Sequence, residues 1–354
     1  MPLETLKIDH LRNITQTQLR FSPGMNLIAG PNASGKTSLL EAIALLTQGR
    51  SFRTPRIDQL IQHQSRGFTI VGTILTGQSH HTLGLARENK KTQVRLDGTS
   101  LNRSTDLIDL QPLHVITPES HELLDQGPKM RRQYLDWGVF HVKHGYLACW
   151  QRYYRVLRQR NQVLRAGGDT QTIQAWDGPL VLEANQLHSY RTTYLQELSP
   201  ALINFGQQLL EMQIEFTYRP GWSMDSSSFA AQLKSDLPQD KERGFTQSGP
   251  HRADILVRAD GMVVNQVFSR GQQKLLICAM YLAQVANSPK AGILLIDDLP
   301  AELDPIRRTR LMAAAASTQA QLFVTATEAD LIPTNGWDQK KVFHVERGDF
   351  CEVV

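Results

Sequence analysis

The stretch Gly30-Pro31-Asn32-Ala33-Ser34-Gly35-Lys36-Thr37 matches the pattern G-x-x-x-x-G-K-[ST] at each fixed position. An apolar run, residues 25–29, precedes it as a buried strand would, and residues 38–46 follow it with the spacing of a helix. A strand, a glycine-rich loop and a helix in this order form a P-loop, in which backbone N–H groups and the positive end of the helix dipole surround phosphate oxygens. The sequence therefore predicts a nucleotide-binding site at this loop.

The fixed positions of the loop have distinct parts in holding ATP. Lys36 reaches the β- and γ-phosphates of a bound nucleotide as a point charge, and Thr37 places its hydroxyl on Mg²⁺. We therefore expect Lys36 to contribute to catalysis and Thr37 to bind the metal. Gly30 and Gly35 allow the backbone to turn its N–H groups toward the phosphates. The further residues that we expect to bind ATP are Arg12, Asn32, Ser34 and Ser38.

An acidic pair near the C-terminus supplies the second part of such a site. Ile293-Leu294-Leu295-Ile296-Asp297-Asp298 is an apolar run that ends in two carboxylates. This pattern is typical of a buried parallel strand with acids at its carboxyl end, where open α/β sheets bind ligands. We expect a Walker B motif, in which Asp297 holds Mg²⁺ opposite Thr37 and Asp298 orients, or accepts a proton from, the attacking water.

The composition of the 354 residues is that of an ordinary globular protein, with 41% hydrophobic and 20% charged residues. No apolar run approaches the length of a membrane span and the N-terminus lacks the pattern of a leader, so we expect a cytoplasmic protein that does not contact a membrane. The three cysteines are far apart and show no C-x-x-C spacing. This argues against a disulfide framework and against a zinc site.

The pattern along the chain predicts an α/β protein in which a helical segment interrupts a nucleotide-binding head. Residues 3–11, 17–21, 69–74, 82–85, 93–96 and 113–116 have the character of strands. Helical spacing begins at Glu119, residues 213–218 have the pattern of a strand that returns to the first domain, and one short helix is expected near 229–233. We therefore expect the N-terminal half of the head at 1–118, a helical lobe at 119–212 and the C-terminal half of the head at 213–354.

Basic residues gather in the first part of the helical segment. Between Lys129 and Arg165 there are nine Lys and Arg and one acid, Asp136, which leaves a local balance of +8. A solvated helix face usually mixes the two signs, so we favour a surface for a polyanion, although a solvated face over an aromatic core remains an alternative. The residues that we expect to bind DNA are Lys129, Arg131, Arg132, Arg152, Arg155 and Arg158, with the face continuing to Arg165.

The apolar residues of the same segment predict how its helices pack. A stripe with 3–4 spacing contains Leu147, Trp150, Tyr154, Leu157, Asn161 and Leu164. Asn161 takes an inner position in this stripe, and the arginines lie largely off it. A second apolar series, from Leu180 to Leu198, can fold back against the first as an antiparallel helical hairpin.

A third motif narrows the class of nucleotide-binding protein. Phe268-Ser269-Arg270-Gly271-Gln272-Gln273-Lys274 resembles the LSGGQ signature of the ABC ATPases, with Ser269, Gly271 and Gln272 in register. Ala301-Glu302-Leu303-Asp304 resembles their D-loop, and Thr325 and Thr327 lie where ABC transporters carry a switch histidine. The resemblance implies an ATP-sandwiched homodimer, in which the signature of one protomer, here Ser269, Arg270, Gly271 and Gln272, completes the ATP site of the other.

Several features together resemble the RecF family, in the SMC-like branch of the ABC ATPases. They are Arg270 within the signature, the Asp297-Asp298 pair, Thr117-Pro118-Glu119, Gly127-Pro128-Lys129 with Arg131-Arg132, Leu135-Asp136-Trp137 and Gly249-Pro250-His251-Arg252. The resemblance implies an ABC-type P-loop ATPase head, with a mixed sheet, an antiparallel subsheet and an inserted helical lobe. Taken alone, His251 of the last motif is expected to be a satisfied surface residue rather than a ligand.

The resemblance also implies a function. A RecF-like protein would bind ATP and Mg²⁺, dimerise around ATP on gapped DNA or single-strand/double-strand junctions, and hydrolyse ATP slowly to release the DNA. This is a weak, DNA-stimulated ATPase that serves recombinational repair and replication restart together with recombination mediator proteins. Asp298 stands where most ABC ATPases have the longer glutamate, which fits slow turnover because the shorter side chain places water less well.

Two departures from the ABC pattern bear on the site. Ala301 stands where a serine is usual in the D-loop, and Pro300 precedes it. Both departures count against the contact between protomers that is expected at Asp304. The segment from Thr117 to Glu119 is our assignment for the Q-loop.

Two other functions remain as alternatives. A structural DNA clamp would bind ATP but scarcely hydrolyse it, and DNA-stimulated phosphate release would separate it from an ATPase. A transporter-type ABC subunit would use the same ATP site to drive a membrane partner. The basic helical insertion, the altered signature and the missing switch histidine argue against the transporter.

Overall fold

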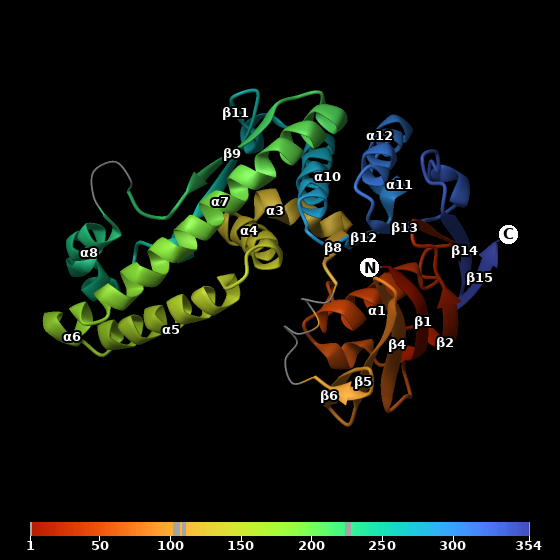
Figure 1. Cartoon of the computed structure of the whole chain (residues 1–354), viewed down its shortest axis with the longest axis horizontal. Coiled ribbons are helices and arrows are strands. Elements are labelled where there is room, and N and C mark those ends of the chain that lie inside the picture. Colours follow the sequence, from red (N-terminus) through yellow and green to blue (C-terminus); the bar gives the residue numbers. More distant parts are fainter. Residues whose placement is uncertain (1, 102–106, 108–110, 224–227, 354) are drawn as a thin grey trace. The chain divides into compact units, whose positions relative to one another are not determined.

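The computed structural model describes residues 2–101, 107, 111–223 and 228–353 of the chain. Within it the chain forms two compact units, and most of their elements are labelled in Figure 1. The first unit consists of residues 1–120, 208–210 and 270–354, and the second of residues 121–207 and 211–269. The second unit therefore continues to Ser269, beyond the boundary at residue 212 that we expected for the lobe.

A mixed six-stranded sheet lies in the first unit, in the order β15-β14-β3-β13-β12-β8. Its strands are β3 (Met25–Ala29), β8 (Leu113–Ile116), β12 (Ile293–Ile296), β13 (Gln321–Ala326), β14 (Lys340–Glu346) and β15 (Asp349–Val353). Only β15 is antiparallel to its neighbour. The strand before the P-loop (β3) and the strand before the acidic pair (β12) both pair with β13, which lies between them.

An antiparallel six-stranded sheet completes this unit, in the order β2-β1-β4-β5-β6-β7. Its strands are β1 (Leu3–Leu11), β2 (Ile14–Arg20), β4 (Gly67–Thr76), β5 (Ser79–Glu88), β6 (Lys91–Leu96) and β7 (Thr99–Ser100). Asp97 and Gly98 form the two-residue turn after β6, and both have positive φ (49° and 81°), as such turns require. The α/β class and the mixed sheet with an antiparallel subsheet are confirmed.

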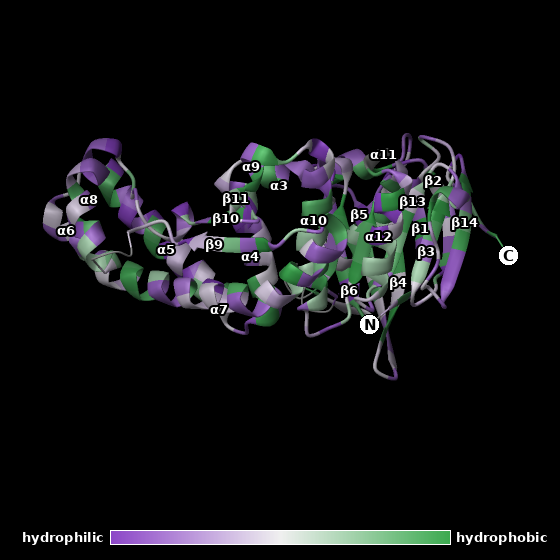
Figure 2. Ribbon diagram, turned by 90° about the horizontal axis from the view of Figure 1, so that it is seen from above, coloured by the Kyte–Doolittle hydropathy of each residue, from purple (hydrophilic) through white to green (hydrophobic). Residues whose placement is uncertain are grey.

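Helix α1 (Lys36–Gln48) packs between the two sheets. It contacts β1, β4 and β5 of the antiparallel sheet and β8 and β13 of the mixed sheet. Its residues are buried on nearly all sides, which is typical of a helix enclosed by other elements. One hydrophobic cluster includes residues of α1 and of both sheets, and Figure 2 shows hydrophobic residues concentrated in the strands of this unit. The helix that carries the P-loop lysine is therefore fixed from both sides.

A buried glutamine joins the two sheets. Gln321, at the start of β13, accepts a hydrogen bond from the backbone N–H of Leu3 (2.8 Å) and donates to the carbonyl oxygens of Leu3 and Ser22 (2.8 Å each). The side chain is only 2% exposed, and these bonds satisfy its polar atoms. The first residues of the chain are thereby bound to the central strand of the mixed sheet.

The remaining helical segments of the first unit lie in the connections between strands. They are η1 (Ile57–Leu60), α10 (Arg270–Ala286), α11 (Leu299–Glu302), α12 (Pro305–Ala316) and η4 (Ala329–Leu331). Helix α10 contacts both β8 and α12. Because α10 begins at Arg270, the signature-like motif lies at the N-terminus of this helix.

The second unit combines a small sheet with seven α-helices in the described part of the chain. The sheet is antiparallel, in the order β11-β10-β9, with β9 (Ile214–Arg219), β10 (Asp254–Ala259) and β11 (Met262–Val263). The helical segments are α3 (Glu122–Asp125), α4 (Pro128–Val142), α5 (Tyr146–Arg165), α6 (Thr170–Gln174), α7 (Asp177–Leu210), α8 (Phe229–Arg243), α9 (Val264–Val267) and the short η3 (Pro250–Arg252), with η2 (Pro118–His121) at the boundary.

Two sequence expectations about this unit are wrong. The strand β9 does not return to the sheets of the first unit, because it pairs along its length with β10. The segment after residue 228 forms the fifteen-residue helix α8 instead of a short helix near 229–233. Its buried Phe229, Leu233, Leu237 and Asp240 recur at helical spacing, and this packing outweighs the internal Pro238.

The buried stripe of α5 also differs from the expected one. The buried residues are Tyr146, Cys149, Tyr153, Leu157, Arg160 and Leu164. The stripe is thus shifted by one residue over most of its length, and Arg160 replaces Asn161 as the innermost polar residue. The expectation that the arginines of this helix lie off its buried face is wrong for Arg160.

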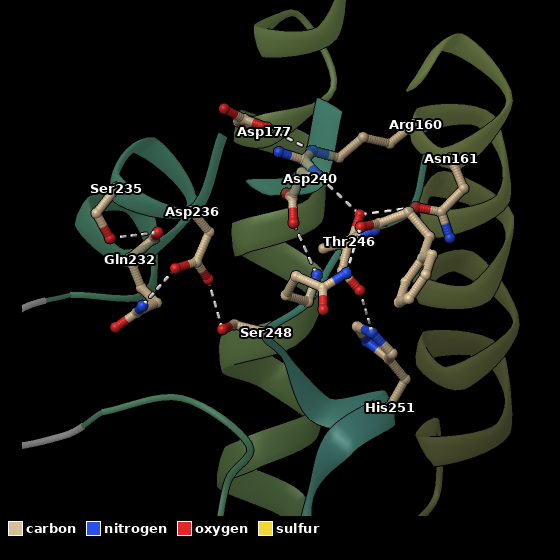
Figure 3. Close-up of polar contacts among 12 residues, drawn as sticks. Arg160, Asn161, Asp177, Gln232, Ser235, Asp236, Asp240, Thr246, Ser248 and His251 are labelled. Carbon is tan, nitrogen blue, oxygen red and sulfur yellow. Dashed lines mark hydrogen bonds and ion pairs between the residues drawn. The ribbon is translucent and has the colours of Figure 1, made fainter. Parts of the chain in front are cut away.

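Arg160 is buried because it has acidic and hydroxyl partners from three other segments (Figure 3). Its guanidinium donates to Asp177 of α7 (2.8 Å), to Asp240 of α8 (2.7 Å) and to the hydroxyl of Thr246 (2.7 Å). The side chains of Arg160 and Asp240 are both 0% exposed. Burial raises the pKa of Asp240, and the hydrogen bond and charge of Arg160 oppose this shift. This network binds α5, α7, α8 and the segment after α8 to one another.

Removal of one partner from this pair should destabilise the second unit. We expect Arg160→Met to lower the free energy of unfolding by about 3–5 kcal/mol, because Asp240 then stays buried without its counter-charge. Arg160→Met combined with Asp240→Leu should recover most of this loss. Urea unfolding followed by tryptophan fluorescence measures it, because Trp137, Trp150, Trp176 and Trp222 all lie in this unit. Arg155→Met, on the exposed face of α5, is the control, and a loss as large as that of Arg160→Met would contradict the prediction.

Candidate nucleotide-binding site

In the P-loop, the side chain of Lys36 folds back onto the backbone of the loop. Lys36 is 7% exposed, and its ammonium group donates to the carbonyl oxygens of Gly30 (2.7 Å) and Pro31 (2.8 Å). Burial lowers the pKa of Lys36, and the nearby carboxylates of Asp298 and Asp297 oppose the shift. Gly30 must be a glycine, because a Cβ there would lie 2.2 Å from the carbonyl oxygen of Val345.

Two polar side chains, Asn13 and Ser34, lie at the P-loop and differ in their hydrogen bonding. Asn13, in the turn after β1, accepts a hydrogen bond from Ser38 (2.8 Å) and donates to the carbonyl oxygen of Ala33 (3.3 Å). The hydroxyl of Ser34 is buried without a hydrogen-bond partner among the described residues. A buried hydroxyl of this kind fits a loop that is built to receive phosphate oxygens. The sequence did not single out Asn13; its position beside Arg12 at the end of the first strand was the available signal.

Arg12 contacts α1 rather than the loop itself. Its guanidinium forms a two-pronged ion pair with Glu41 (3.0 and 3.1 Å) and donates to the carbonyl oxygen of Gln59 (3.2 Å). Glu41 is 0% exposed and also accepts a hydrogen bond from Ser51. The ion pair therefore ties the end of β1 and the segment after α1 to the P-loop helix, and a direct contact of Arg12 with ATP stays a prediction.

The acidic pair meets the P-loop across 260 residues of sequence. The hydroxyl of Thr37 donates to both carboxylate oxygens of Asp297, at 3.0 and 2.9 Å. Thr325 of β13 donates to the same carboxylate (2.8 Å), and the backbone N–H of Asp298 donates to the hydroxyl of Thr325 (2.7 Å). Asp298 has a left-handed backbone, with φ of 51° and ψ of 46°, and caps α11. The structure thus brings Lys36, Thr37 and the two acids together.

The electrostatics of Asp297 identify one more basic residue near the site. Burial raises the pKa of Asp297, whose side chain is almost completely enclosed. Hydrogen bonds from Thr325 and Thr37 lower it, the charge of Asp298 raises it, and the charge of Arg53 lowers it. Arg53 is not among the residues that we expected at this site. The run of Arg50, Arg53 and Arg56 just after the P-loop helix was the signal that could have found it.

The donor set suits magnesium rather than a metal held by the protein alone. Among the described residues there is no group of three or more His, Cys, Asp or Glu side chains that could hold a metal ion. Mg²⁺ usually takes one or two carboxylates and completes its shell with phosphate oxygens and water. Asp297 and Thr37 offer that partial set, so the residues fit Mg²⁺ bound together with a nucleotide.

Arg307 of α12 lies against Gly271 of the signature-like motif and pairs with Asp304 of the D-loop. Gly271, in the first turn of α10, is approached so closely by Arg307 that a Cβ there would lie 2.6 Å from the guanidinium. Arg307 also pairs with Asp304 (3.3 Å), and Asp304 caps α12 by accepting from the backbone N–H of Arg307 (3.0 Å). Ser269 and Arg270 are exposed. Contacts of these motifs with a second copy stay predictions.

Two further expected site segments lie at the carboxyl ends of the strands. Thr117 follows β8, whose last residue, Ile116, accepts a hydrogen bond from the backbone N–H of Asp297 (2.9 Å). This places the segment that we assigned to the Q-loop beside the Walker B motif. Thr327 lies just past the end of β13 and is partly exposed, whereas Thr325, inside the strand, is 0% exposed.

The basic residues of the second unit separate into an interior and an exposed group. Arg131 forms a two-pronged ion pair with Asp254 (2.8 and 3.0 Å), and Arg132 donates to the carbonyl oxygen of Ala253 (2.7 Å). These two arginines hold α4 against the start of β10. The remaining residues of the expected DNA surface are exposed: Lys129, Arg152, Arg155 and Arg158, of which Arg152 pairs with Glu183 of α7 (2.6 Å).

One exposed stripe of α5 is basic and carries no acid. It contains Gln151, Arg155, Arg158, Gln162 and Arg165, which recur at steps of four and three residues on the side opposite the buried stripe. Asp136 is the single acid between Lys129 and Arg165. Its carboxylate pairs with the buried Arg191 of α7 and so does not neutralise the arginines of this stripe. Among the residues that the structure describes, Arg155, Arg158 and Arg165 of this stripe form no ion pair, so the exposed face of α5 is basic.

The Gly249-Pro250-His251-Arg252 motif lies against the interior of the lobe. His251 interacts through Nδ1 with the hydroxyl of Tyr153 (2.7 Å) and through Nε2 with the carbonyl oxygen of Thr246 (3.1 Å). Because a carbonyl only accepts, Nε2 carries the proton and Tyr153 donates to Nδ1. Burial, with the nearby Arg252, Arg132 and Arg191, lowers the pKa of His251 to about 4. His251 is satisfied, as expected, but it is half-buried rather than exposed.

Comparison with known proteins identifies the family. The family described as RecF/RecN/SMC N terminal domain matches residues 2–349. The DNA replication and repair protein RecF of Hydrogenovibrio crunogenus is 40% identical over 98% of this chain and 98% of its own length. The chain belongs to the RecF family. A second RecF protein, from Stutzerimonas stutzeri, is 38% identical over 100% of this chain and 98% of its own length.

Solved structures confirm the RecF-type fold. A structure of the recombination mediator protein RecF with ATP has a TM-score of 0.85 at 24% identity and covers 99% of this chain and 97% of that chain. An SMC head bound to the C-winged helix domain of ScpA has a TM-score of 0.64 at 13% identity and covers 100% of this chain and 97% of that chain. The fold is therefore that of an SMC/RecF-type ABC ATPase head with a long helical insertion.

RecF membership sets the transporter-type alternative aside. In the part of the chain that the structure describes, none of the helices combines the length and the hydrophobicity that crossing a bilayer requires. Even the long helix α7 carries charged and polar residues throughout. The sequence expectation of a RecF-like protein is confirmed, whereas the individual site residues stay predictions from the geometry.

The half-buried His251 should make the stability of this RecF-family protein depend on pH. Its folded pKa of about 4 lies below the ordinary value of 6.5, so the unfolded chain binds a proton first as the pH falls. Stability is therefore full above about pH 6.5 and is lost toward pH 4, by at most about 2 kcal/mol between pH 7 and pH 5. Urea unfolding followed by tryptophan fluorescence should show a flatter pH dependence in His251→Gln. The exposed His144→Gln is the matched control, and equal slopes in both variants would contradict the prediction.

Proposed function

We propose that this RecF-family protein binds ATP with Mg²⁺ and uses slow ATP hydrolysis to time its residence on DNA. The observation that carries the proposal is the direct contact of Thr37 with Asp297 beside the buried Lys36. These residues come from the two ends of the chain, and no purely structural need explains a lysine, two acids and a glycine-rich loop at one sheet edge. This combination is the apparatus of a P-loop NTPase.

The residues of the site divide the work of ATP binding and hydrolysis. Lys36 would exchange its contacts with Gly30 and Pro31 for phosphate oxygens, and the loop N–H groups would hold the phosphates. Thr37 and Asp297 would hold the metal, which when bound supplies charge neutralisation on the phosphates. Asp298 would orient the attacking water or accept its proton. Its short side chain fits a slow enzyme.

Dimerisation around ATP is supported by the position of the signature-like motif. Ser269 and Arg270 are exposed at the N-terminus of α10, where backbone N–H groups and the helix dipole favour an anion. By the family resemblance, this surface would meet the ATP of a second copy, and Asp304 would lie at the same interface. Solved RecF structures of the same fold are described with ATP and as part of the RecFOR pathway. Recombination mediator proteins are accordingly the partners that we propose.

DNA binding is supported by the exposed basic stripe of α5 and by Lys129. Basic side chains on a helix without interleaved acids suit the phosphate backbone, which carries no sequence information. We therefore propose binding that is sensitive to salt and largely indifferent to sequence, with gapped duplexes and single-strand/double-strand junctions as the ligands that the family resemblance implies.

Sedimentation with Mg²⁺ and ATP, with and without a gapped duplex, tests this function when phosphate release is measured in parallel. We expect a shift from monomer to dimer that needs ATP and is stronger on DNA, together with slow hydrolysis that DNA stimulates. Lys36→Ala should abolish the shift, because the phosphates lose their cation. Tight ATP-dependent dimers of Lys36→Ala would contradict the scheme. Dimers of the wild type that release no phosphate would indicate the structural clamp instead.

The α5 stripe makes a separate prediction about DNA. Arg155→Gln with Arg158→Gln should weaken DNA binding and should reduce the slope of log affinity against log salt by about 2 per protomer, because two phosphate contacts are lost. Fluorescence anisotropy over a salt series measures this slope. Arg152→Gln, whose parent side chain pairs with Glu183, is the contrast and should have a smaller effect. An unchanged slope in the double variant would place the DNA elsewhere.

A further inference from the structure

Thr325 occupies the point where the strands of the P-loop and of the acidic pair come together. It belongs to β13, which pairs with β3 through Thr325 and Ile28 and with β12 through Val324 and Ile296. It therefore lies level with Asp297, one residue beyond the end of β12. Its side chain is 0% exposed. A threonine this short and this enclosed cannot reach a ligand as an exposed switch residue would.

The hydroxyl of Thr325 accepts one hydrogen bond and donates another. Its hydroxyl has one proton to donate and lone pairs to accept with. The backbone N–H of Asp298 can only donate, so the hydroxyl oxygen accepts that bond (2.7 Å). The hydroxyl proton then goes to Asp297 (2.8 Å), because an ionised carboxylate only accepts. A chain of two hydrogen bonds thus connects the backbone of one acid to the carboxylate of the other.

These two hydrogen bonds restrain the backbone of Asp298 and the carboxylate of Asp297. Asp298 has a left-handed backbone, which most residues adopt only when the surroundings require it. The bond from its N–H fixes the peptide before this turn and with it the direction of the Asp298 side chain. The bond to Asp297 stabilises a carboxylate that is almost completely buried and keeps one of its oxygens in place.

We propose that Thr325 is a positioning residue that couples the metal-binding carboxylate of Asp297 to the orientation of Asp298. The proposal rests on the ATPase function proposed above and gives the expected switch position a different role, because Thr325 holds the acids and does not sense the γ-phosphate. Thr327, beyond the strand and partly exposed, is the residue of the pair that could still act as a switch.

Three threonine variants of the full chain test the proposal. Thr325→Val removes the hydroxyl at nearly constant volume, and Thr325→Ser keeps it. Thr47→Val is the matched control, because Thr47 is buried in α1 and donates only to the carbonyl oxygens of its own helix. For each variant we would measure the binding of a fluorescent ATP analogue, phosphate release with DNA, and amide hydrogen exchange of the peptide that contains Asp298.

The expected result separates turnover from binding. Thr325→Val should bind the analogue within about threefold of the wild type but release phosphate at least about tenfold more slowly, because Asp298 loses its fixed direction. Its Asp298 amide should exchange at least about tenfold faster, because the N–H loses its acceptor. Thr325→Ser and Thr47→Val should stay close to the wild type in all three measurements.

Other outcomes overturn the proposal. Phosphate release by Thr325→Val within about twofold of the wild type would remove Thr325 from its role, and so would an equal loss in Thr47→Val. If the wild type itself hydrolyses no ATP, the proposed function fails. Amide exchange then decides the positioning role alone: faster exchange in Thr325→Val but not in Thr325→Ser supports it, and equal exchange overturns it.

Discussion

The buried carboxylate of Asp297 is the constraint on which the arrangement of the first unit depends. A carboxylate that is almost completely removed from water is stable only with donors around it. Here the donors are the hydroxyls of Thr37 and Thr325, from the P-loop helix and the central strand. The backbone N–H of the same residue bonds to Ile116 at the end of β8. One residue therefore holds together three elements that are far apart in sequence, and the P-loop and the acidic pair lie at one site because these elements meet.

In the second unit the buried charges are positive, and they too are stabilised by hydrogen-bonding partners. Two fully buried arginines, Arg160 and Arg191, hold the lobe together through carboxylates and backbone oxygens of other helices and loops. Arg131 does so in part, through Asp254. The basic residues of the second unit thus fall into two groups. Some are counter-charges in the interior, and the others, on the exposed stripe of α5, remain for a polyanion. A total charge cannot distinguish the two groups, whereas burial does.

Much of the fold could be predicted from the sequence because its signals are local. The strand limits at 3–11 and 113–116 and the P-loop context all agree with the structure. The errors share one cause. The stripe of α5 was shifted because Arg160 counted as a surface residue, and its acids lie on α7 and α8. The strand at 214–219 was placed in the wrong unit because a single strand does not reveal its partner, and β10 begins beyond a whole helix.

The sequence by itself was enough to identify the family and to predict a nucleotide-binding site. A P-loop, an acidic strand end and a signature motif are contiguous patterns, because phosphate binding needs a particular local backbone and a few neighbouring side chains. The tertiary structure decided which arginines are interior, that His251 bonds to Tyr153 and Thr246, and that Thr325 connects the two acids. Each of these depends on partners that are distant along the chain, and the free energy of burying a polar group is set by such partners rather than by the residue alone.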